Sequence, residues 1–216
     1  MEEKTLSVRE LFKLDEETLK NLGEVTVEGW VRNNRNSGKV GFIALHDGTC
    51  FKSLQVVYDG DHPFFEEVSH YKMGSAVSFK GTIVLTPGMK QPFEMHATAV
   101  QLLGDVADDY PLQKKKTSFE YLRDLAYLRP RTNTFDALFR VRSVLAMGVH
   151  TFFQNNGFVY VHTPEITAND AEGAGSVFTV ITDSKEDPIN DFFGRRASLT
   201  VSGQLHVEAF ALAFKD

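Results

Sequence analysis

Side chains able to hold an unpaired nucleic-acid base gather within residues 32–55 of the chain. A phenyl ring can stack on a base, which contributes about 1–3 kcal/mol, and Phe42 supplies one in an alternating segment. The amide of Gln55 can both donate and accept hydrogen bonds at a base edge. Three nearby cations could bind phosphates or stack on bases: Arg32, Arg35 and Lys39. On residue types alone, a core or barrel-end position for Phe42 is favoured because the chain has many phenylalanines, and the three cations could be solvated surface charges.

The charge of the chain is negative overall but uneven. The formal net charge of −6 argues against indiscriminate binding of nucleic acid, which requires cations to neutralise phosphates. Residues 112–131 nevertheless hold six cations against Glu120 and Asp124, six minus two, or +4. Such a segment favours either a local contact with a polyanion or a solvated linker. Its cations are Lys114, Lys115, Lys116, Arg123, Arg129 and Arg131.

Composition narrows the class of protein. A hydrophobic content of 42% with 24% charged residues is ordinary for a globular protein and permits one or two buried cores. The single cysteine, Cys50, excludes an intramolecular disulfide and a cysteine-built zinc site. The acidic start of the sequence has no apolar stretch behind it, and no run is long enough to span a bilayer. We therefore expect a soluble cytoplasmic protein.

The first half of the chain reads as a small β-barrel behind a helical lead-in. A capping box at Ser7–Glu10 and a second short helix over residues 15–23 precede the strands. A period of two then predicts strands over residues 25–31, 40–46 and 53–58. A short helix over residues 63–71 and strands over residues 76–85 and 93–103 follow. Three strands, a helix and two strands is the order of an OB-fold, which binds oligonucleotides across strands two and three.

The second half begins after an Asp-rich boundary at residues 104–111. A helical period starts at Phe135, and five apolar residues make one stripe: Leu138, Val141, Leu145, Val149 and Phe152. Short strands are predicted over residues 158–161 and 197–201, and a helix over residues 204–214. The expected fold class is therefore α+β.

An ordered set of motifs resembles one family across nearly the whole chain. Gly29-Trp30-Val31-Arg32, followed by Arg35, Gly38, Phe42 and Asp47-Gly48-Thr49, resembles the opening of the anticodon-binding OB domain of class IIb aminoacyl-tRNA synthetases. Residues 121–123 and 128–131 resemble their hinge, and residues 152–164 resemble class II motif 1. Residues 200–205 resemble the amino-acid-binding segment. The set is similar to the N-terminal portion of bacterial asparaginyl-tRNA synthetases.

The resemblance implies the domain organisation. It predicts a five-stranded OB-fold anticodon-binding domain with its lead-in over residues 1–106 and a hinge over residues 107–131. A partial class II catalytic domain with an antiparallel sheet is expected over residues 132–216. Motif 1 of this family forms a dimer interface, so the apolar stripe would be exposed unless chains pair. The resemblance assigns Phe152, Phe153 and Pro164 to that interface.

The same resemblance assigns tRNA-binding residues. In the similar aspartyl enzymes, the matching phenylalanine and glutamine engage the middle uridine of the anticodon, which tRNA(Asn) shares. The residues expected to bind tRNA here are Arg32, Arg35, Lys39, Phe42, Gln55 and Arg129.

Four residues are implied for the amino-acid site. Glu172, Ser202 and Gln204 match residues that hold the substrate's α-ammonium group, for which a carboxylate is a suitable partner. Val207 replaces the lysine with which aspartyl enzymes bind a side-chain carboxylate, and Glu208 follows it. The loss of this cation favours asparagine over aspartate, and one such exchange can set specificity. A role for Glu208 at the substrate amide is a hypothesis, and a surface glutamate is its alternative.

Motifs 2 and 3 of class II synthetases, which supply the arginines for ATP, are not found in the sequence. We therefore expect no catalytic residue and no metal site in this chain, and no amino-acid activation by the chain alone. The resemblance implies that the complete enzyme uses ATP and Mg²⁺ to form asparaginyl-adenylate, transfers the asparaginyl group to tRNA(Asn), and is a homodimer.

Three alternatives stay open. The chain could be a fragment of an aspartyl-type synthetase, which Val207 argues against, or a non-catalytic tRNA- or RNA-binding module. It could also be a paralogue that synthesises free asparagine, which the OB domain argues against.

Overall fold

The computed structural model describes residues 4–114, 117–169, 177–182, 187 and 189–214. The chain divides into two compact units, Met1–Phe139 and Arg140–Asp216. The first unit holds the barrel and the hinge, and the second holds most of a long helix, a small sheet and a final helix. The expected domain bounds at residues 106 and 131 stay a prediction.

Two short helices precede the barrel. Helix α1 spans Val8–Leu11, and the predicted capping box is confirmed: Ser7 N donates to Glu10 Oε2 at 2.8 Å, and Glu10 N donates to Ser7 Oγ at 3.2 Å. Helix α2 spans Glu16–Lys20 and begins at Asp15, whose carboxylate accepts from Thr18 N at 2.7 Å. It ends at Lys20, earlier than predicted, with Asn21 as its C-cap. Gly23, with φ +73°, then turns the chain into the first strand.

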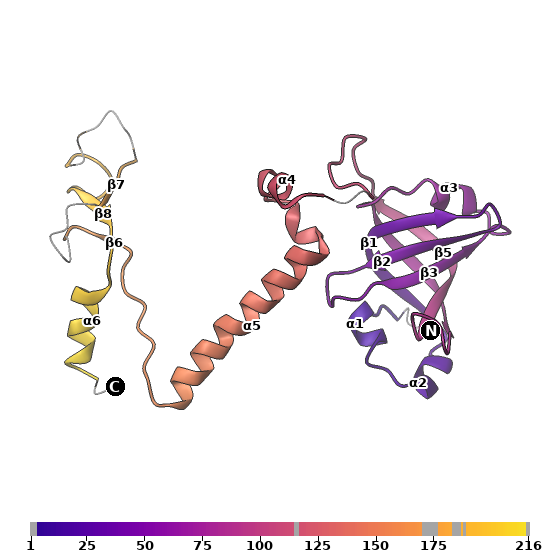
Figure 1. The fold of residues 1–216 in the computed structure, drawn as a ribbon, viewed down its shortest axis with the longest axis horizontal. Coiled ribbons are helices and arrows are strands. Elements are labelled where there is room, and N and C mark those ends of the chain that lie inside the picture. The colour runs from indigo at the N-terminus through magenta and orange to yellow at the C-terminus, as the bar shows by residue number, and fades with distance from the viewer. Residues whose placement is uncertain (1–3, 115–116, 170–176, 183–186, 188, 215–216) are drawn as a thin grey trace. The chain divides into compact units, whose positions relative to one another are not determined.

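Five strands close into a barrel in the order β1-β2-β3-β5-β4 (Figure 1). They are β1 Glu24–Asn36, β2 Val40–His46, β3 Leu54–Asp59, β4 Ala76–Leu85 and β5 Phe93–Gly104, with α3 Phe65–Ser69 between β3 and β4. Strands β3 and β5 pair in parallel, and the other neighbours pair antiparallel. The predicted OB-fold order is confirmed. Strand β1 runs further than predicted because residues 33–36 pair with β2 after a register shift.

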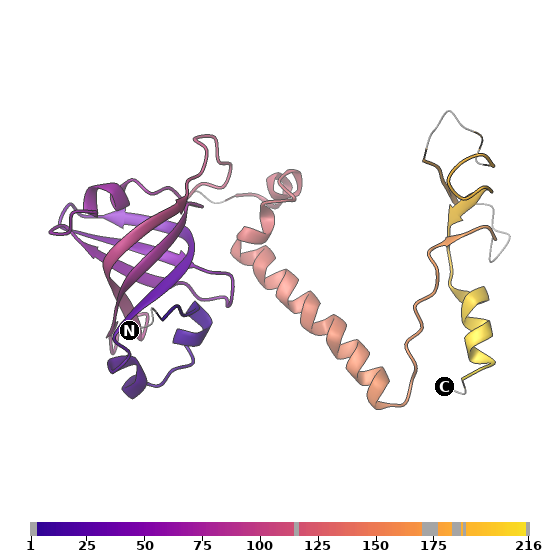
Figure 2. The same ribbon diagram turned by 180° about the vertical axis from the view of Figure 1, so that it is seen from behind.

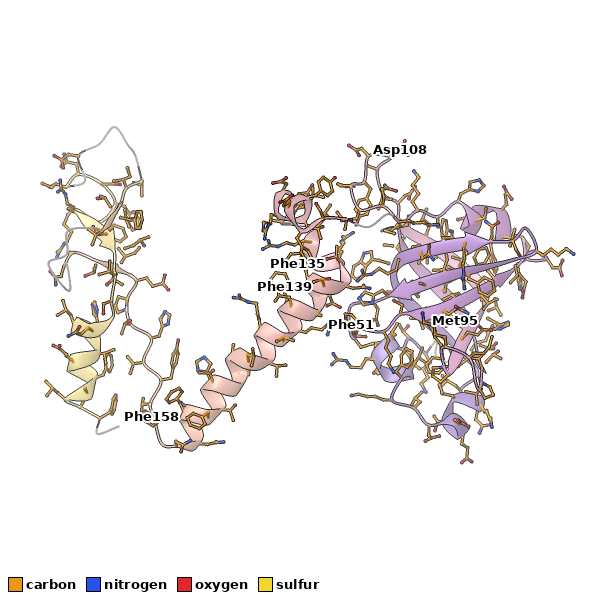
Figure 3. The ribbon with its side chains drawn as sticks, in the orientation of Figure 1. Phe51, Met95, Asp108, Phe135, Phe139 and Phe158 are labelled. Atoms are coloured by element: carbon orange, nitrogen blue, oxygen red, sulfur yellow. The ribbon has the colours of Figure 1, made fainter. Side chains whose placement is uncertain are left out.

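The barrel interior is filled by alternate residues of its strands. Val27, Ile43, Val56 and Phe79 are fully buried, as is Met95 of β5 (Figure 3). Helices α1 and α2 lie together at one end of the barrel (Figures 1 and 2) and add buried side chains to the same core: Val8, Leu11 and Leu19.

The Asp47-Gly48-Thr49 turn after β2 attaches α1 to the barrel. Asp47 Oδ2 accepts from Val8 N at 2.7 Å, and Thr49 Oγ1 accepts from Arg9 N at 3.1 Å. Asp47 Oδ1 in turn accepts from the backbone N and the hydroxyl of Thr49, at 2.9 and 2.7 Å. The motif therefore caps α1 with hydrogen bonds to amides that no helical carbonyl can reach.

Polar contacts tie the hinge, and Asp105 just before it, to the barrel. Ser75 Oγ donates to Asp105 at 2.9 Å, Lys72 pairs with Asp108 at 2.6 Å, and Lys114 Nζ donates to the Asn34 carbonyl at 2.5 Å. Helix α4 Phe119–Asp124 and the 3₁₀ turn Arg129–Arg131 follow. A small apolar cluster holds them: Leu112, Leu122 and Leu128, with Tyr110, Leu125 and Phe135.

The second unit contains little buried surface among its described residues. Helix α5 Asn133–Asn155, which enters it from the first unit, has no buried residue, and the predicted stripe is 47% to 63% exposed from Leu138 to Phe152. Strands β6 Ile166–Thr167, β7 Phe178–Val180 and β8 Ala197–Leu199 form an antiparallel sheet in the order β6-β8-β7, and α6 spans Gln204–Ala211. Of the described residues after Phe139, only Ala197 is buried.

The strand predicted over residues 158–161 is wrong, because no other described segment pairs with it. The last strand and the last helix are also shorter than predicted, ending at Leu199 and Ala211. No helix of the described residues is both long and apolar enough to cross a membrane.

We predict that Asp47→Ala destabilises the first unit. The substitution leaves the amides of Val8 and Thr49 without their acceptor, at a cost of about 1–3 kcal/mol in the free energy of unfolding. Urea unfolding followed by the fluorescence of Trp30 measures this change. Asp61→Ala, which removes an exposed carboxylate from the β3–α3 loop, is the control and should leave the midpoint unchanged. Equal midpoints for the two variants would show that the cap contributes nothing.

Candidate nucleic-acid interface

A groove of about 410 Å³ lies on the outer face of the barrel. It brings together three of the predicted RNA-binding residues, Arg35 of β1, Phe42 of β2 and Gln55 of β3. The rest of its lining comes from the same strands, the β4–β5 loop and β5: Asn33, Ile43, Ala44, Thr86, Met89, Lys90, Gln91 and Glu94. Strands two and three with a neighbouring loop are where OB-folds bind oligonucleotides.

Phe42 offers a ring on the outside of the barrel. Ile43 and Leu45, its neighbours along β2, are fully buried, whereas Phe42 is only partly buried. Phe42 therefore lies on the opposite face of β2 from Ile43 and Leu45, as its place in an alternating segment indicates. Arg35 is the cross-strand partner of Phe42, and its guanidinium carbon lies 5.0 Å from the ring centroid. A planar cation beside an accessible ring can hold a base by stacking and a phosphate by charge.

Gln55 is held in one orientation by a carboxylate. Its Nε2 donates to Glu94 Oε2 at 2.9 Å, and its backbone N donates to Gln91 Oε1 at 3.2 Å. The other oxygen of Glu94 lies 3.1 Å from His96 Nε2. Because the amide NH₂ is directed to Glu94, the side-chain carbonyl of Gln55 is available as an acceptor for a ring N–H of a base.

The β4–β5 loop forms one wall of the groove. Thr86 accepts from Met89 N at 3.1 Å, donates from its own N to Pro92 O at 2.9 Å, and donates from its hydroxyl to Gln91 O at 2.7 Å. These bonds fix a loop whose Met89 side chain is 73% exposed. Sequence analysis missed Glu94, Lys90, Gln91 and Met89, although the alternation of residues 93–97 places Glu94 and His96 on the outward face.

The groove has a small excess of positive charge. Arg35 and Lys90 face Glu94, two cations against one carboxylate, with His96 beside the carboxylate. This excess suits a single strand of nucleic acid, whose phosphates need partial neutralisation while its bases need an apolar platform.

Three predicted RNA-binding residues lie outside the groove. Lys39 is exposed in the β1–β2 turn, where its carbonyl accepts from Gly60 N at 2.8 Å. Arg129 stacks on two rings at the start of α5 (Figure 3), with its Cζ 5.0 Å from the Phe135 centroid and 6.0 Å from that of Phe139. Arg32 donates to the Arg131 carbonyl. RNA contacts by these three cations stay predictions.

A second cavity of the first unit, of about 310 Å³, surrounds Arg32. Its lining includes Trp30, His46, Tyr110, Arg131 and Asp136. Burial lowers the pKa of the Arg32 guanidinium, partly offset by Asp136. Burial first, and the Arg32 charge second, also lower the pKa of His46, which is 6% exposed. His46 is therefore neutral in the folded protein at neutral pH.

The second unit brings three of the predicted amino-acid-binding residues together at the start of α6. Gln204 N donates to Ser202 Oγ at 3.1 Å, and Gln204 Nε2 lies 3.3 Å from Glu208 Oε1. Gly203 between them approaches Thr163 so closely that an added Cβ would lie 2.5 Å from its hydroxyl oxygen. Glu172 lies outside the described residues.

The predicted dimer-interface residues are exposed within the chain. Phe152 is 62% exposed, Phe153 is 45% exposed, and Pro164 is exposed on the segment after α5. Their pairing with a second chain stays a prediction. The described residues hold no group of three or more His, Cys, Asp or Glu side chains placed to bind a metal ion.

Two protein-family models match separate parts of the chain. Residues 25–103 match the OB-fold nucleic acid binding domain, and residues 118–216 match the class II tRNA synthetases (D, K and N).

Curated relatives are similar to this chain along most of its length. An asparagine–tRNA ligase of Alkaliphilus metalliredigens is 51% identical over 222 residues, which cover 98% of this chain and 48% of the relative. That of Bacillus cereus strain ATCC 10987 is 51% identical over 202 residues, covering 89% of this chain and 44% of the relative. The chain thus spans about half the length of the curated relatives it matches.

Solved structures show the same fold at lower identity. Asparaginyl-tRNA synthetase of Pyrococcus horikoshii, complexed with asparaginyl-adenylate, matches with a TM-score of 0.79 at 24% identity, covering 98% of this chain and 46% of that one. The Entamoeba histolytica enzyme, also complexed with asparaginyl-adenylate, matches with a TM-score of 0.70 at 20% identity, covering 94% of this chain and 44% of that one.

We predict that His46 makes folding depend on pH. Its pKa is lower when folded than the unfolded value of about 6.5, so the unfolded chain binds the extra proton first and stability falls as the pH drops through and below that value. His46→Gln should make the free energy of unfolding depend less on pH in this range. The part of the dependence that arises from carboxylates should remain. The free energy of urea unfolding, compared between about pH 7.5 and pH 5.5, measures the effect. Parallel slopes for His46→Gln and the wild type would contradict it.

Proposed function

We propose that the chain is part of an asparagine–tRNA ligase. Residues 118–216, which match the class II tRNA synthetases (D, K and N), support this proposal. In this proposal the complete enzyme activates asparagine with ATP and transfers it to tRNA(Asn). The described chain binds the anticodon with its barrel and contributes part of the amino-acid site. The observation that carries the proposal is the groove in which Arg35, Phe42 and Gln55 meet. The chain that forms this groove is 51% identical in sequence to an asparagine–tRNA ligase over 222 residues.

Each groove residue has a proposed role in holding one anticodon base. The Phe42 ring stacks on the base, and the Arg35 guanidinium beside it neutralises a phosphate or extends the stack. Gln55, oriented by Glu94, accepts the N–H of the base through its side-chain carbonyl. A uracil offers such an N–H at N3, flanked by two carbonyls, so this arrangement suits a uridine in the middle of the anticodon.

The amino-acid site is proposed around the start of α6. Ser202, Gln204 and Glu172 would hold the ammonium group of asparagine, and Glu208 would accept a hydrogen bond from the side-chain amide. Val207 provides no cation for a carboxylate, which favours asparagine over aspartate. The 3.3 Å contact between Gln204 Nε2 and Glu208 Oε1 supports a shared site for these two residues.

ATP and Mg²⁺ are proposed for the complete enzyme. Assembly as a homodimer through the exposed apolar stripe of α5 and a cytoplasmic location complete the proposal.

A non-catalytic RNA-binding module is the second candidate for the chain by itself. The barrel has a complete core, whereas Ala197 is the only buried residue among those described after Phe139. A function that needs only the barrel is therefore better supported by packing than one that needs an enclosed catalytic site.

We predict that the chain binds an anticodon hairpin with the anticodon GUU more tightly than one with the anticodon GUC. Phe42→Ala should weaken both by about five- to a hundredfold, the loss of one base stack. Fluorescence anisotropy at fixed low salt measures both affinities. Phe51→Ala is the matched control, because Phe51 is 54% exposed and lies on the β2–β3 loop outside the groove lining (Figure 3). Equal binding of the two hairpins would favour the general RNA-binding module over the asparagine–tRNA ligase.

We also predict that the 216-residue chain catalyses no asparagine-dependent exchange between ATP and pyrophosphate. Catalysis of this kind depends on preorganised groups in a site that excludes water, and Ser202, Gln204 and Glu208 lie in a unit with almost no buried residue. The exchange assay with radiolabelled pyrophosphate measures this directly. Any exchange that requires asparagine would overturn the prediction.

A further inference from the structure

Arg32 occupies a different environment from Arg35, although three positions separate them on β1. Arg35 lies over Phe42 in the base-binding groove, whereas Arg32 does not line that groove. Its Nη1 donates to the carbonyl of Arg131, the last residue of the 3₁₀ turn in the hinge. Strand β1 shifts register between Val31 and Asn33, so Arg32 sits at the irregularity where the strand is free to direct a side chain out of its usual alternation.

Arg131 makes the reciprocal contact from the hinge to the barrel. Its guanidinium carbon lies 5.8 Å from the ring centroid of Trp30, the residue before Val31 on β1. Its Nη1 donates to the Tyr110 hydroxyl at 3.1 Å. Two arginines therefore cross between the barrel and the hinge, one to a backbone carbonyl and one to an aromatic face. Because a planar guanidinium is pre-organised for such contacts, little side-chain freedom is lost in forming them.

The Arg32 side chain is partly buried. Burial lowers the pKa of Arg32, and Asp136 at the start of α5 offsets part of that effect. Burying a guanidinium without partners would be costly in free energy. Arg32 is compensated by its hydrogen bond to the Arg131 carbonyl and by the negative charge of Asp136. The same cavity contains His46, whose neutral state avoids a second charge beside Arg32.

The hinge that Arg32 holds has an exposed surface suited to RNA. Tyr121 and Tyr127 are 44% and 74% exposed, and Arg123 between them is exposed. Aromatic rings with a cation among them are the chemistry of sequence-tolerant RNA contact.

We propose that Arg32 is a positioning residue that clamps the hinge turn onto the barrel, so that a tRNA held in the groove also meets the exposed hinge side chains. The inference rests on the proposed function and gives Arg32 a role other than direct contact with RNA. Two surfaces that bind one ligand gain affinity only while their geometry allows simultaneous engagement. Loosening the clamp should therefore affect a whole tRNA more than an anticodon hairpin.

The test compares Arg32→Met with Arg35→Met in the full chain. Both variants remove one guanidinium from β1 and keep an apolar stem. Arg32→Met should bind the GUU hairpin within about twofold of the wild type but lose about tenfold in affinity for the whole tRNA. Arg35→Met should lose about tenfold for both ligands. Arg32→Lys, which can still donate to the Arg131 carbonyl, should restore most of the affinity for the whole tRNA.

Trp30 reports on the clamp without RNA, because it is the single tryptophan of the chain. Acrylamide should quench its fluorescence more strongly in Arg32→Met than in the wild type, and Arg35→Met should leave the quenching unchanged. Arg131→Met, at an exposed hinge position, tests the clamp from the other side if Arg32→Met does not fold. It should reproduce both the increased quenching and the selective loss of tRNA affinity.

The outcomes separate the clamp from the proposed function. Equal loss of hairpin binding in Arg32→Met and Arg35→Met would overturn the clamp and make Arg32 an RNA contact. Unchanged quenching in both Arg32→Met and Arg131→Met would also overturn it. A wild-type chain that binds neither RNA would instead contradict the proposed function. The quenching of Trp30 fluorescence would then be the only test of the clamp.

Discussion

The two-residue period of the barrel strands is the constraint on which both the core and the candidate site depend. Along β2 the period buries Ile43 and Leu45 and leaves Phe42, which precedes them, on the outside. Along β3 it buries Leu54 and Val56 and turns Gln55 outward. A slip of one residue in either strand would exchange the two faces, so the packing that stabilises the barrel also fixes the position of the groove.

Contacts outside the barrel wall then connect the other elements to it. The Asp47 turn caps α1, which covers one end of the core. The contacts of Arg32 with the Arg131 carbonyl and of Arg131 with the Trp30 ring join the hinge to β1. Motif residues that resemble a binding sequence are thus used for two purposes. Arg35 and Phe42 face the groove, whereas Arg32 and the Asp47-Gly48-Thr49 turn hold the structure around it.

The described residues of the second unit are much less buried than those of the barrel. Helix α5 carries an apolar stripe with no buried residue. In the small sheet of the same unit, Ala197 is the only buried residue among those described. Ser202, Gln204 and Glu208 are close to one another, but nothing in the described part of this unit encloses them. Hydrophobic burial stabilises a site and excludes water from it, so the barrel and this unit differ in both respects.

The sequence alone determined the order of the barrel strands, the capping box and the outward face of Phe42, because these follow from local periodicity and capping chemistry. It did not determine the strand expected at residues 158–161, since a strand needs a partner as well as a pattern. It also missed Glu94, which reaches Gln55 from 39 positions away, and the direction of Arg32. Only the tertiary structure decided those contacts, because closing the barrel and docking the hinge bring together side chains that are distant in the chain.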